Sequence, residues 1–134
     1  MASIDMIEGI GHRQATSLRK ARIRTVEALL KKGSTRRGRR EIAAATKISE
    51  KLIVEWVNRA DLMRVRGVGE EYSDLLEAAG VDTVKELRRR NSTNLLAAMV
   101  DVNTKKQLVR RLPTEAMVQR WVDHAQSLEA IVKY

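Results

Sequence analysis

Residues 7–11 read Ile-Glu-Gly-Ile-Gly, and residues 65–69 read Val-Arg-Gly-Val-Gly. Both stretches follow the order hydrophobic, variable, Gly, hydrophobic, Gly. Two glycines let the backbone turn through φ values that other residues avoid, and the hydrophobic residue between them anchors the turn in a core. The N–H groups of such a turn and of the next helix face outward, where they favour a phosphate. The pattern predicts two tight turns between helices.

The two turns belong to a longer internal repeat, which indicates that the chain is built from similar units. At a spacing of 58 residues the matches include Gly9/Gly67, Gly11/Gly69, Leu18/Leu76, Ala21/Ala79, Ile23/Val81, Thr25/Thr83 and Leu29/Leu87. At a spacing of 65 residues they include Leu52/Met117, Ile53/Val118, Trp56/Trp121, Val57/Val122, Ala60/Ala125 and Met63/Leu128. We expect one unit over residues 1–61 and a second over residues 62–134, which includes a short C-terminal tail. We expect the units to pack into one compact domain.

Helical periodicity runs through both units, and no stretch alternates with period two for long enough to predict a strand. The fold class that we predict is therefore all-α. N-caps are expected at Thr25, Ser49, Thr83 and Thr114. Gly33 is expected to end a helix as a C′ glycine, and residues 39–46 to form another helix. Because Trp56 and Trp121 each lie in an apolar helical stripe, both are expected in the core.

Composition excludes several classes of protein. The chain has 134 residues and no Cys, so it holds neither a disulfide nor a thiolate metal site. It shows no signal-peptide pattern, and its longest apolar run, residues 95–100, is too short to cross a bilayer. We expect a cytoplasmic protein without membrane association. No catalytic set, phosphate-binding loop or metal-ligand spacing is evident, so we expect no enzyme activity, cofactor, metal or small-molecule substrate.

Charge is distributed unequally along the chain. The net charge is +9, which favours a polyanionic partner such as nucleic acid. Residues 1–66 contain 16 Lys/Arg and 7 Asp/Glu, whereas residues 67–134 contain 10 of each. His12 and Arg13 follow the first turn, but Glu70 and Glu71 follow the second, where a phosphate would dock. The second turn is therefore expected to be structural or to face a basic protein partner.

The densest basic run is Arg36-Arg37-Gly38-Arg39-Arg40, which we expect in a loop and at the start of a helix. Cations at a helix N-terminus oppose the helix dipole, so local stability does not account for them. Phosphate binding and a solvated surface explain the run equally well. Arg88, Arg89 and Arg90 lie near the end of a helix, where the dipole alone accounts for them.

The turns at residues 7–11 and 65–69 resemble the helix-hairpin-helix motif of DNA-binding proteins. Ala15 and Ser73 lie at the small position that follows the second glycine, and Leu18 and Leu76 lie three residues further on. Nearly the whole chain is similar to the tandem helix-hairpin-helix proteins of the DUF4332 family, mostly through residues 80–87 and 49–56. The resemblance implies a fold of helical repeats and a grip on the DNA backbone that does not depend on base sequence.

These observations together favour a non-enzymatic protein that binds nucleic acid, most simply DNA, through backbone phosphates. The candidate residues are Gly9, Ile10, Gly11, His12, Arg13, Lys20, Arg22, Arg36, Arg37, Arg39 and Arg40. The main alternative is a protein-interaction adaptor in which the turns only brace the fold. A further alternative is a helix-turn-helix over residues 41–58, which would present Glu50, Lys51, Val54, Glu55 and Asn58 to the major groove.

Overall fold

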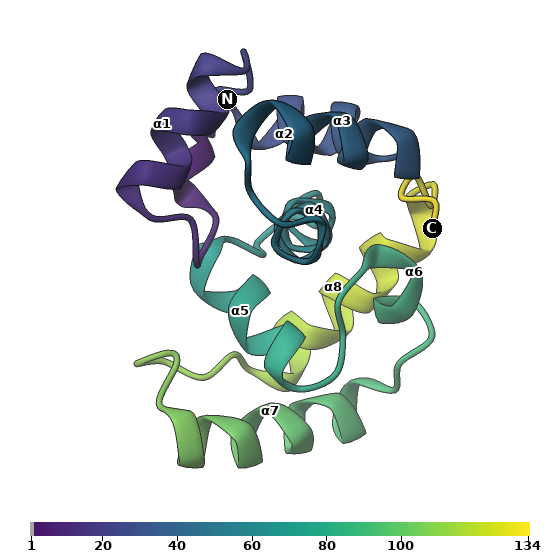
Figure 1. Ribbon diagram of the computed structural model, residues 1–134. Helices are drawn as coiled ribbons and strands as arrows, with labels where there is room; N and C mark the ends of the chain where they lie inside the picture. The colour runs from purple at the N-terminus through teal and green to yellow at the C-terminus, as the bar shows by residue number, and fades with distance from the viewer. Residues whose placement is uncertain (1) are drawn as a thin grey trace. The chain divides into compact units, whose positions relative to one another are not determined.

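The computed structural model describes residues 2–134, and their regular structure is helical (Figure 1). The elements are η1 (Ile4–Met6), α1 (His12–Lys20), α2 (Val26–Gly33), α3 (Arg36–Thr46), α4 (Glu50–Leu62), α5 (Glu70–Ala78), α6 (Val84–Leu87), α7 (Ser92–Lys106) and α8 (Glu115–Ser127). The predicted all-α class is confirmed. No helix within residues 2–134 is long and apolar enough to cross a membrane.

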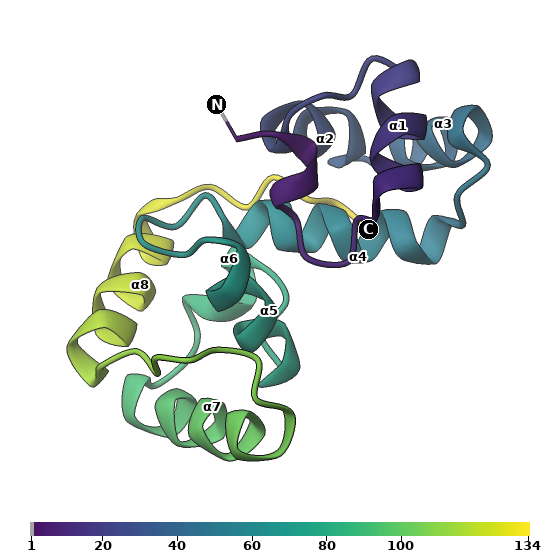
Figure 2. The same cartoon turned by 90° about the vertical axis from the view of Figure 1, so that its left-hand side faces the viewer.

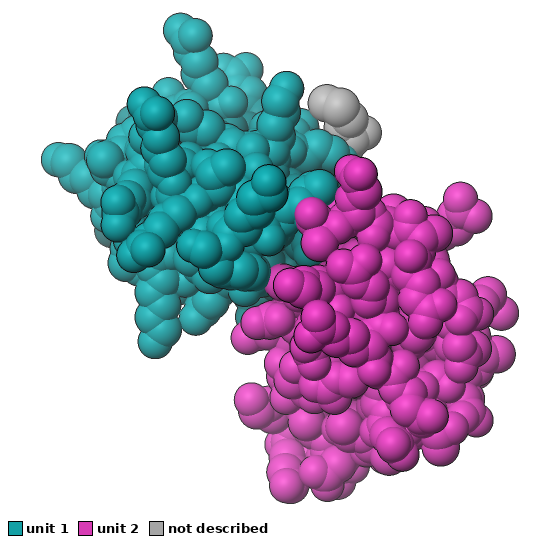
Figure 3. Space-filling model, turned by 90° about the vertical axis from the view of Figure 1, so that its right-hand side faces the viewer, with its two compact units in different colours: residues 1–61, 131–134 teal, residues 62–130 magenta. Residues whose placement is uncertain are grey.

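The chain divides into two compact units, which Figure 3 shows in different colours. Unit 1 contains residues 1–61 and 131–134, and unit 2 contains residues 62–130. The C-terminal tail therefore belongs with unit 1 and not, as the sequence predicts, with the second unit. The Lys133 N–H donates to the Ser34 carbonyl oxygen (2.7 Å), and this hydrogen bond attaches the tail to the end of α2. That the two units form one compact domain stays a prediction.

The core of unit 1 is built around α4. Helices α1, α2 and α3 lie around one side of α4 (Figures 1 and 2). The fully buried large side chains of this unit are Ile4, Ile7, Leu18, Leu29, Ile42, Ile53 and Trp56. The segment that begins η1 is fixed to the α1–α2 connection, because the Ile4 N–H donates to the Arg24 carbonyl oxygen (3.0 Å). Trp56 is 1% exposed, which confirms its predicted place in the core.

Unit 2 has its own core, in which α7 packs against α5 and α8, and α6 packs against α8. Its fully buried large side chains are Leu62, Leu75, Leu76, Leu87 and Leu95. Trp121 is 2% exposed, and its ring centroid lies 5.1 Å from that of Tyr72. This position also agrees with the core placement predicted from the sequence.

Three of the predicted N-caps are Thr25, Thr83 and Thr114, whose hydroxyls accept from the N–H groups of Ala28, Glu86 and Met117. The fourth is Ser49, whose hydroxyl accepts from the Leu52 N–H (3.3 Å). These hydrogen bonds satisfy N–H groups that have no partner inside their own helix. The cap predictions are therefore confirmed.

Two boundary predictions were wrong. Gly33 is not a C′ residue but the last residue of α2, where a Cβ would overlap a methyl group of Val57. Helix α3 begins at Arg36 rather than Arg39. Thr35 is its N-cap residue, and the Thr35 hydroxyl accepts from the Gly38 N–H (3.0 Å). The whole basic run is therefore helical.

Candidate nucleic-acid interface

The two turns have the same backbone geometry at their first glycine. Gly9 has φ +95° and Gly67 has φ +91°, a region that L side chains rarely adopt. The residue after each glycine is buried, since Ile10 is 8% and Val68 is 4% exposed. The same backbone bond closes both turns, from the Ile10 N–H to the Ile7 carbonyl oxygen (3.2 Å) and in the second turn from residue 68 to residue 65 (3.0 Å).

The second glycine of each turn does not need its conformational freedom. Gly11 has φ −79° and Gly69 has φ −106°, values that any residue adopts. This corrects our expectation that both glycines are required by backbone geometry. Both are N-cap residues, Gly11 of α1 and Gly69 of α5.

An open hollow with a volume of about 670 Å³ lies beside the first turn. Its walls are the start of α1, from Gly11 to Gln14, and the connection between α3 and α4, residues 46–49. His12, Arg13 and Lys47 line it and are exposed. The Gly11 N–H is already bonded, because it donates to Gln14 Oε1 (2.8 Å). The hollow thus combines the cationic side chains of Arg13 and Lys47 with the N-terminal end of α1.

Lys47 is a residue of this hollow that sequence analysis missed. It ends α3 in the left-handed conformation, with φ +61°, and its N–H donates to the Ala43 carbonyl oxygen. An isolated Lys between two helices carries no signal of its own in the sequence. Its place beside His12 and Arg13 depends on how α3 and α1 pack, which spacing along the chain does not reveal.

The other predicted residues do not line the hollow. Lys20 and Arg22 are exposed at the far end of α1, about 14 Å along a nine-residue helix. Arg36, Arg37 and Arg40 are exposed in the first turns of α3, whereas Lys47 ends that helix. Of the predicted side chains on α1 and α3, the hollow therefore brings together only His12 and Arg13.

Acidic residues accompany the arginines of α3. Glu41 lies 3.3 Å from Arg37 Nε and accepts from Lys32 Nζ (2.7 Å). The hydrogen bond from Lys32, together with the two positive charges, lowers the pKa of Glu41 below its usual value. Arg40 Nε lies 3.8 Å from a Glu50 carboxylate oxygen. Ion pairs this exposed add little stability, so they leave both arginines available to a stronger anion.

Arg39 must be removed from the candidate set. Only 4% of this residue is exposed, and its guanidinium donates to the Gly33 and Lys133 carbonyl oxygens at 2.8 Å each. It also lies over the Tyr134 ring, 5.4 Å from the centroid. Burial lowers the pKa of Arg39. A guanidinium held inside unit 1 in this way cannot reach a phosphate, so its role is to join α3 to the C-terminal tail.

The helix-turn-helix alternative loses one of its outward residues. Asn58 is 8% exposed, and its side-chain oxygen accepts from the Tyr134 hydroxyl. It therefore faces the tail within unit 1 and is not free to read a base.

Comparison with known protein families identifies the family of this chain. Residues 8–128 match the family described as a domain of unknown function, DUF4332. The chain belongs to this family. Searches of curated proteins and of solved structures gave no match.

Proposed function

We propose that the protein is a non-enzymatic nucleic-acid-binding module of the helix-hairpin-helix type, which uses unit 1 to bind the phosphate backbone, most simply of DNA. The observation that carries this proposal is the hollow beside the first turn. Its exposed His12, Arg13 and Lys47 surround the N-terminal end of α1. A helix N-terminus and nearby cations both favour an anion.

The charge of the two units supports the same proposal. Unit 1 contains 15 Lys/Arg and 7 Asp/Glu, whereas unit 2 contains 11 Lys/Arg and 10 Asp/Glu. The α5 helix that follows the second turn begins with Glu70 and Glu71. Negative charge at that position stabilises the helix and repels phosphate. Backbone binding is therefore expected to depend on unit 1.

A protein-interaction adaptor is the second candidate function. It is favoured by the hydrogen bond from the Gly11 N–H to Gln14 Oε1, which gives one turn donor a partner inside the protein. In this alternative the turns brace each unit, and the basic surface of unit 1 has no nucleic-acid partner.

Binding of a fluorescent random-sequence duplex, followed by anisotropy at two salt concentrations, separates the candidates. Three phosphate contacts alone are expected to weaken affinity about 40-fold between about 50 and 200 mM salt, and contacts by the α3 arginines would add to this, because each contact releases counterions. The variant Arg13→Gln/Lys47→Gln should bind more weakly and with a smaller salt dependence. Arg110→Gln/Arg111→Gln, which removes two exposed charges from unit 2, is the matched control. No binding at low salt would favour the adaptor.

A further inference from the structure

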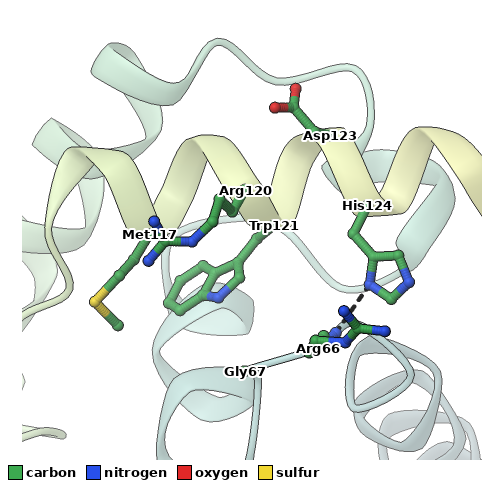
Figure 4. A pocket seen from close by; sticks show the side chains of 7 residues that line it. All are labelled: Arg66, Gly67, Met117, Arg120, Trp121, Asp123 and His124. Carbon is green, nitrogen blue, oxygen red and sulfur yellow. Dashed lines mark hydrogen bonds between the residues drawn. The ribbon is translucent and has the colours of Figure 1, made fainter.

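Unit 2 contains a second cavity, which the proposed phosphate binding does not use. Its volume is about 410 Å³, within the range of small-molecule sites. The lining residues are Arg66, Gly67, Met117, Arg120, Trp121, Asp123 and His124 (Figure 4). They come from the second turn and from α8.

The cavity presents three donors that have no partner among the described residues, 2–134. Neither the Arg66 nor the Arg120 guanidinium makes an ion pair or a hydrogen bond within residues 2–134. The Trp121 indole N–H also makes no hydrogen bond among those residues, and this N–H keeps some solvent-accessible surface although the residue as a whole is only 2% exposed. Its Nε1 atom lies beside Gly67, 3.1 Å from the position of a Cβ at that glycine. Three unpaired donors that line one cavity favour an acceptor supplied by a ligand, and a charged acceptor most strongly.

The space exists because of one difference between the repeats. Arg59 of unit 1 occupies the position that matches His124, and its guanidinium donates to the Glu8 carbonyl oxygen. That side chain lies 2.9 Å from where a Cβ of Gly9 would be. In unit 2, the shorter His124 accepts from the Arg66 N–H through Nδ1 (2.9 Å). The volume that Arg59 fills in unit 1 is therefore left open beside Gly67.

The charges around the matched positions are also reversed. Glu8 and Glu55 of unit 1 correspond to Arg66 and Arg120 of unit 2. The unit 2 cavity is thus the one suited to an anion. Among the described residues that line it, Asp123 is the one acidic residue. Its carboxylate accepts from Gln119 Nε2 (2.8 Å) and points away from Trp121 (Figure 4).

We infer that this cavity binds a small organic anion. Its carboxylate or phosphate group would be held by Arg66, Arg120 and the Trp121 N–H, because charged acceptors form the strongest hydrogen bonds to such donors. Its apolar body would pack against Met117, whose flexible thioether adapts to flat and irregular groups. The inference concerns unit 2 alone and does not rest on the proposed function.

Titration with phenyl phosphate and with benzoate tests the inference, and the two ligands separate phosphate from carboxylate recognition. The readout is the pair of tryptophan indole N–H signals in a nitrogen-proton correlation spectrum. At least one ligand should shift the Trp121 signal to saturation, with a Kd below about 1 mM. The Trp56 signal should not move. Inorganic phosphate should bind at least about tenfold more weakly, because it lacks the apolar body.

Variants matched between the units make the test specific. Arg66→Gln and Arg120→Gln should each raise Kd about tenfold, the usual effect of losing one charged hydrogen bond. Glu55→Gln, at the position of unit 1 that matches Arg120, should have no effect. His124→Arg copies the unit 1 residue and should abolish the Trp121 shift by filling the cavity. Asp123→Asn should tighten binding.

Several results would overturn the inference. They are the absence of a saturating shift with either ligand, an equal shift of both indole signals, and equal affinity for inorganic phosphate. The inference would also be overturned if the Trp121 signal still shifted in a folded His124→Arg variant. Arg120→Gln changes an exposed side chain, so this variant still tests the site if His124→Arg does not fold.

Discussion

At the scale of single residues, the glycines of the two turns make different demands on the backbone. Gly9 and Gly67 have positive φ, whereas Gly11 and Gly69 have extended backbones. Gly9→Ala and Gly67→Ala should each lower the free energy of unfolding by about 1–2 kcal/mol, because a Cβ is strained at positive φ. Urea denaturation of the variants checks this value.

The control for these variants is Gly69→Ala. A Cβ at Gly69 meets no atom within 4 Å, apart from its chain neighbours. Its effect should stay within about 0.5 kcal/mol. Equal destabilisation by Gly69→Ala and Gly67→Ala would show that the second glycine has a role that backbone geometry does not explain.

Arg39 shows why charge in the sequence is not the same as charge on the surface. Its guanidinium joins Gly33 to Lys133 inside unit 1. Arg39→Met should lower the free energy of unfolding by about 2–3 kcal/mol, because two buried carbonyl groups lose their donor. Arg37→Met, at a side chain that is 91% exposed, should change it by less than about 0.5 kcal/mol. Thermal unfolding compares the two, and equal effects would contradict the structural role of Arg39.

At the scale of elements, helix starts can be predicted from the sequence more readily than the close approach of one helix to another. Thr25, Thr83 and Thr114 were predicted as caps because a cap depends on a few neighbouring residues. The start of α3 at Arg36 is not predicted from the sequence, because Gly38 has a low helix propensity and the neighbouring arginines place positive charge at a helix N-terminus. A Cβ at Gly38 would overlap the Lys32 carbonyl oxygen. Such an approach between α2 and α3 exists only in the folded unit.

The ion pairs of Glu41 offset the unfavourable positive charge at the start of α3. Because the folded-state pKa of Glu41 is lowered, its contribution to stability is present above the pKa of the unfolded chain. It is lost as pH falls through the folded-state pKa. Glu41→Gln should therefore reduce the urea midpoint slightly at about pH 7 and have no effect at about pH 2, where the carboxyl group is protonated. An equal loss at both pH values would show that the effect is not electrostatic.

At the scale of the whole molecule, patterns spread over many residues were predictable, but individual positions were not. The all-α class followed from periodicity over long stretches, and the basic excess of unit 1 followed from simple counting. The candidate site was predicted only in part. The burial of Arg39, the position of Lys47 and the cavity beside Gly67 all depend on contacts between residues far apart in the chain. No local pattern records such contacts.

The difference between the two units gives the last prediction. Arg36, Arg37 and Arg40 are exposed on α3 of unit 1, and the triple change to Gln should weaken duplex binding for all sequences alike. Each lost phosphate contact reduces the slope of log affinity against log salt by about 0.9, so the slope should fall by up to about 2.7. Arg39 stays unchanged in this variant, because its replacement would destabilise the fold, and a loss of binding could then not be assigned to a lost phosphate contact.

The matched control removes the same charge from unit 2, by changing Arg89, Arg110 and Arg111 to Gln. These residues are also exposed. Arg88 and Arg90 are kept, because they donate to the Leu128 and Gly80 carbonyl oxygens. If net charge alone attracts the duplex, both triple variants should lose affinity equally. If unit 1 holds the phosphates, only the unit 1 variant should show a smaller slope of log affinity against log salt. The reason is that this slope depends on the number of phosphate contacts and not on the total charge. A slope lost only in the unit 2 variant would reverse the assignment.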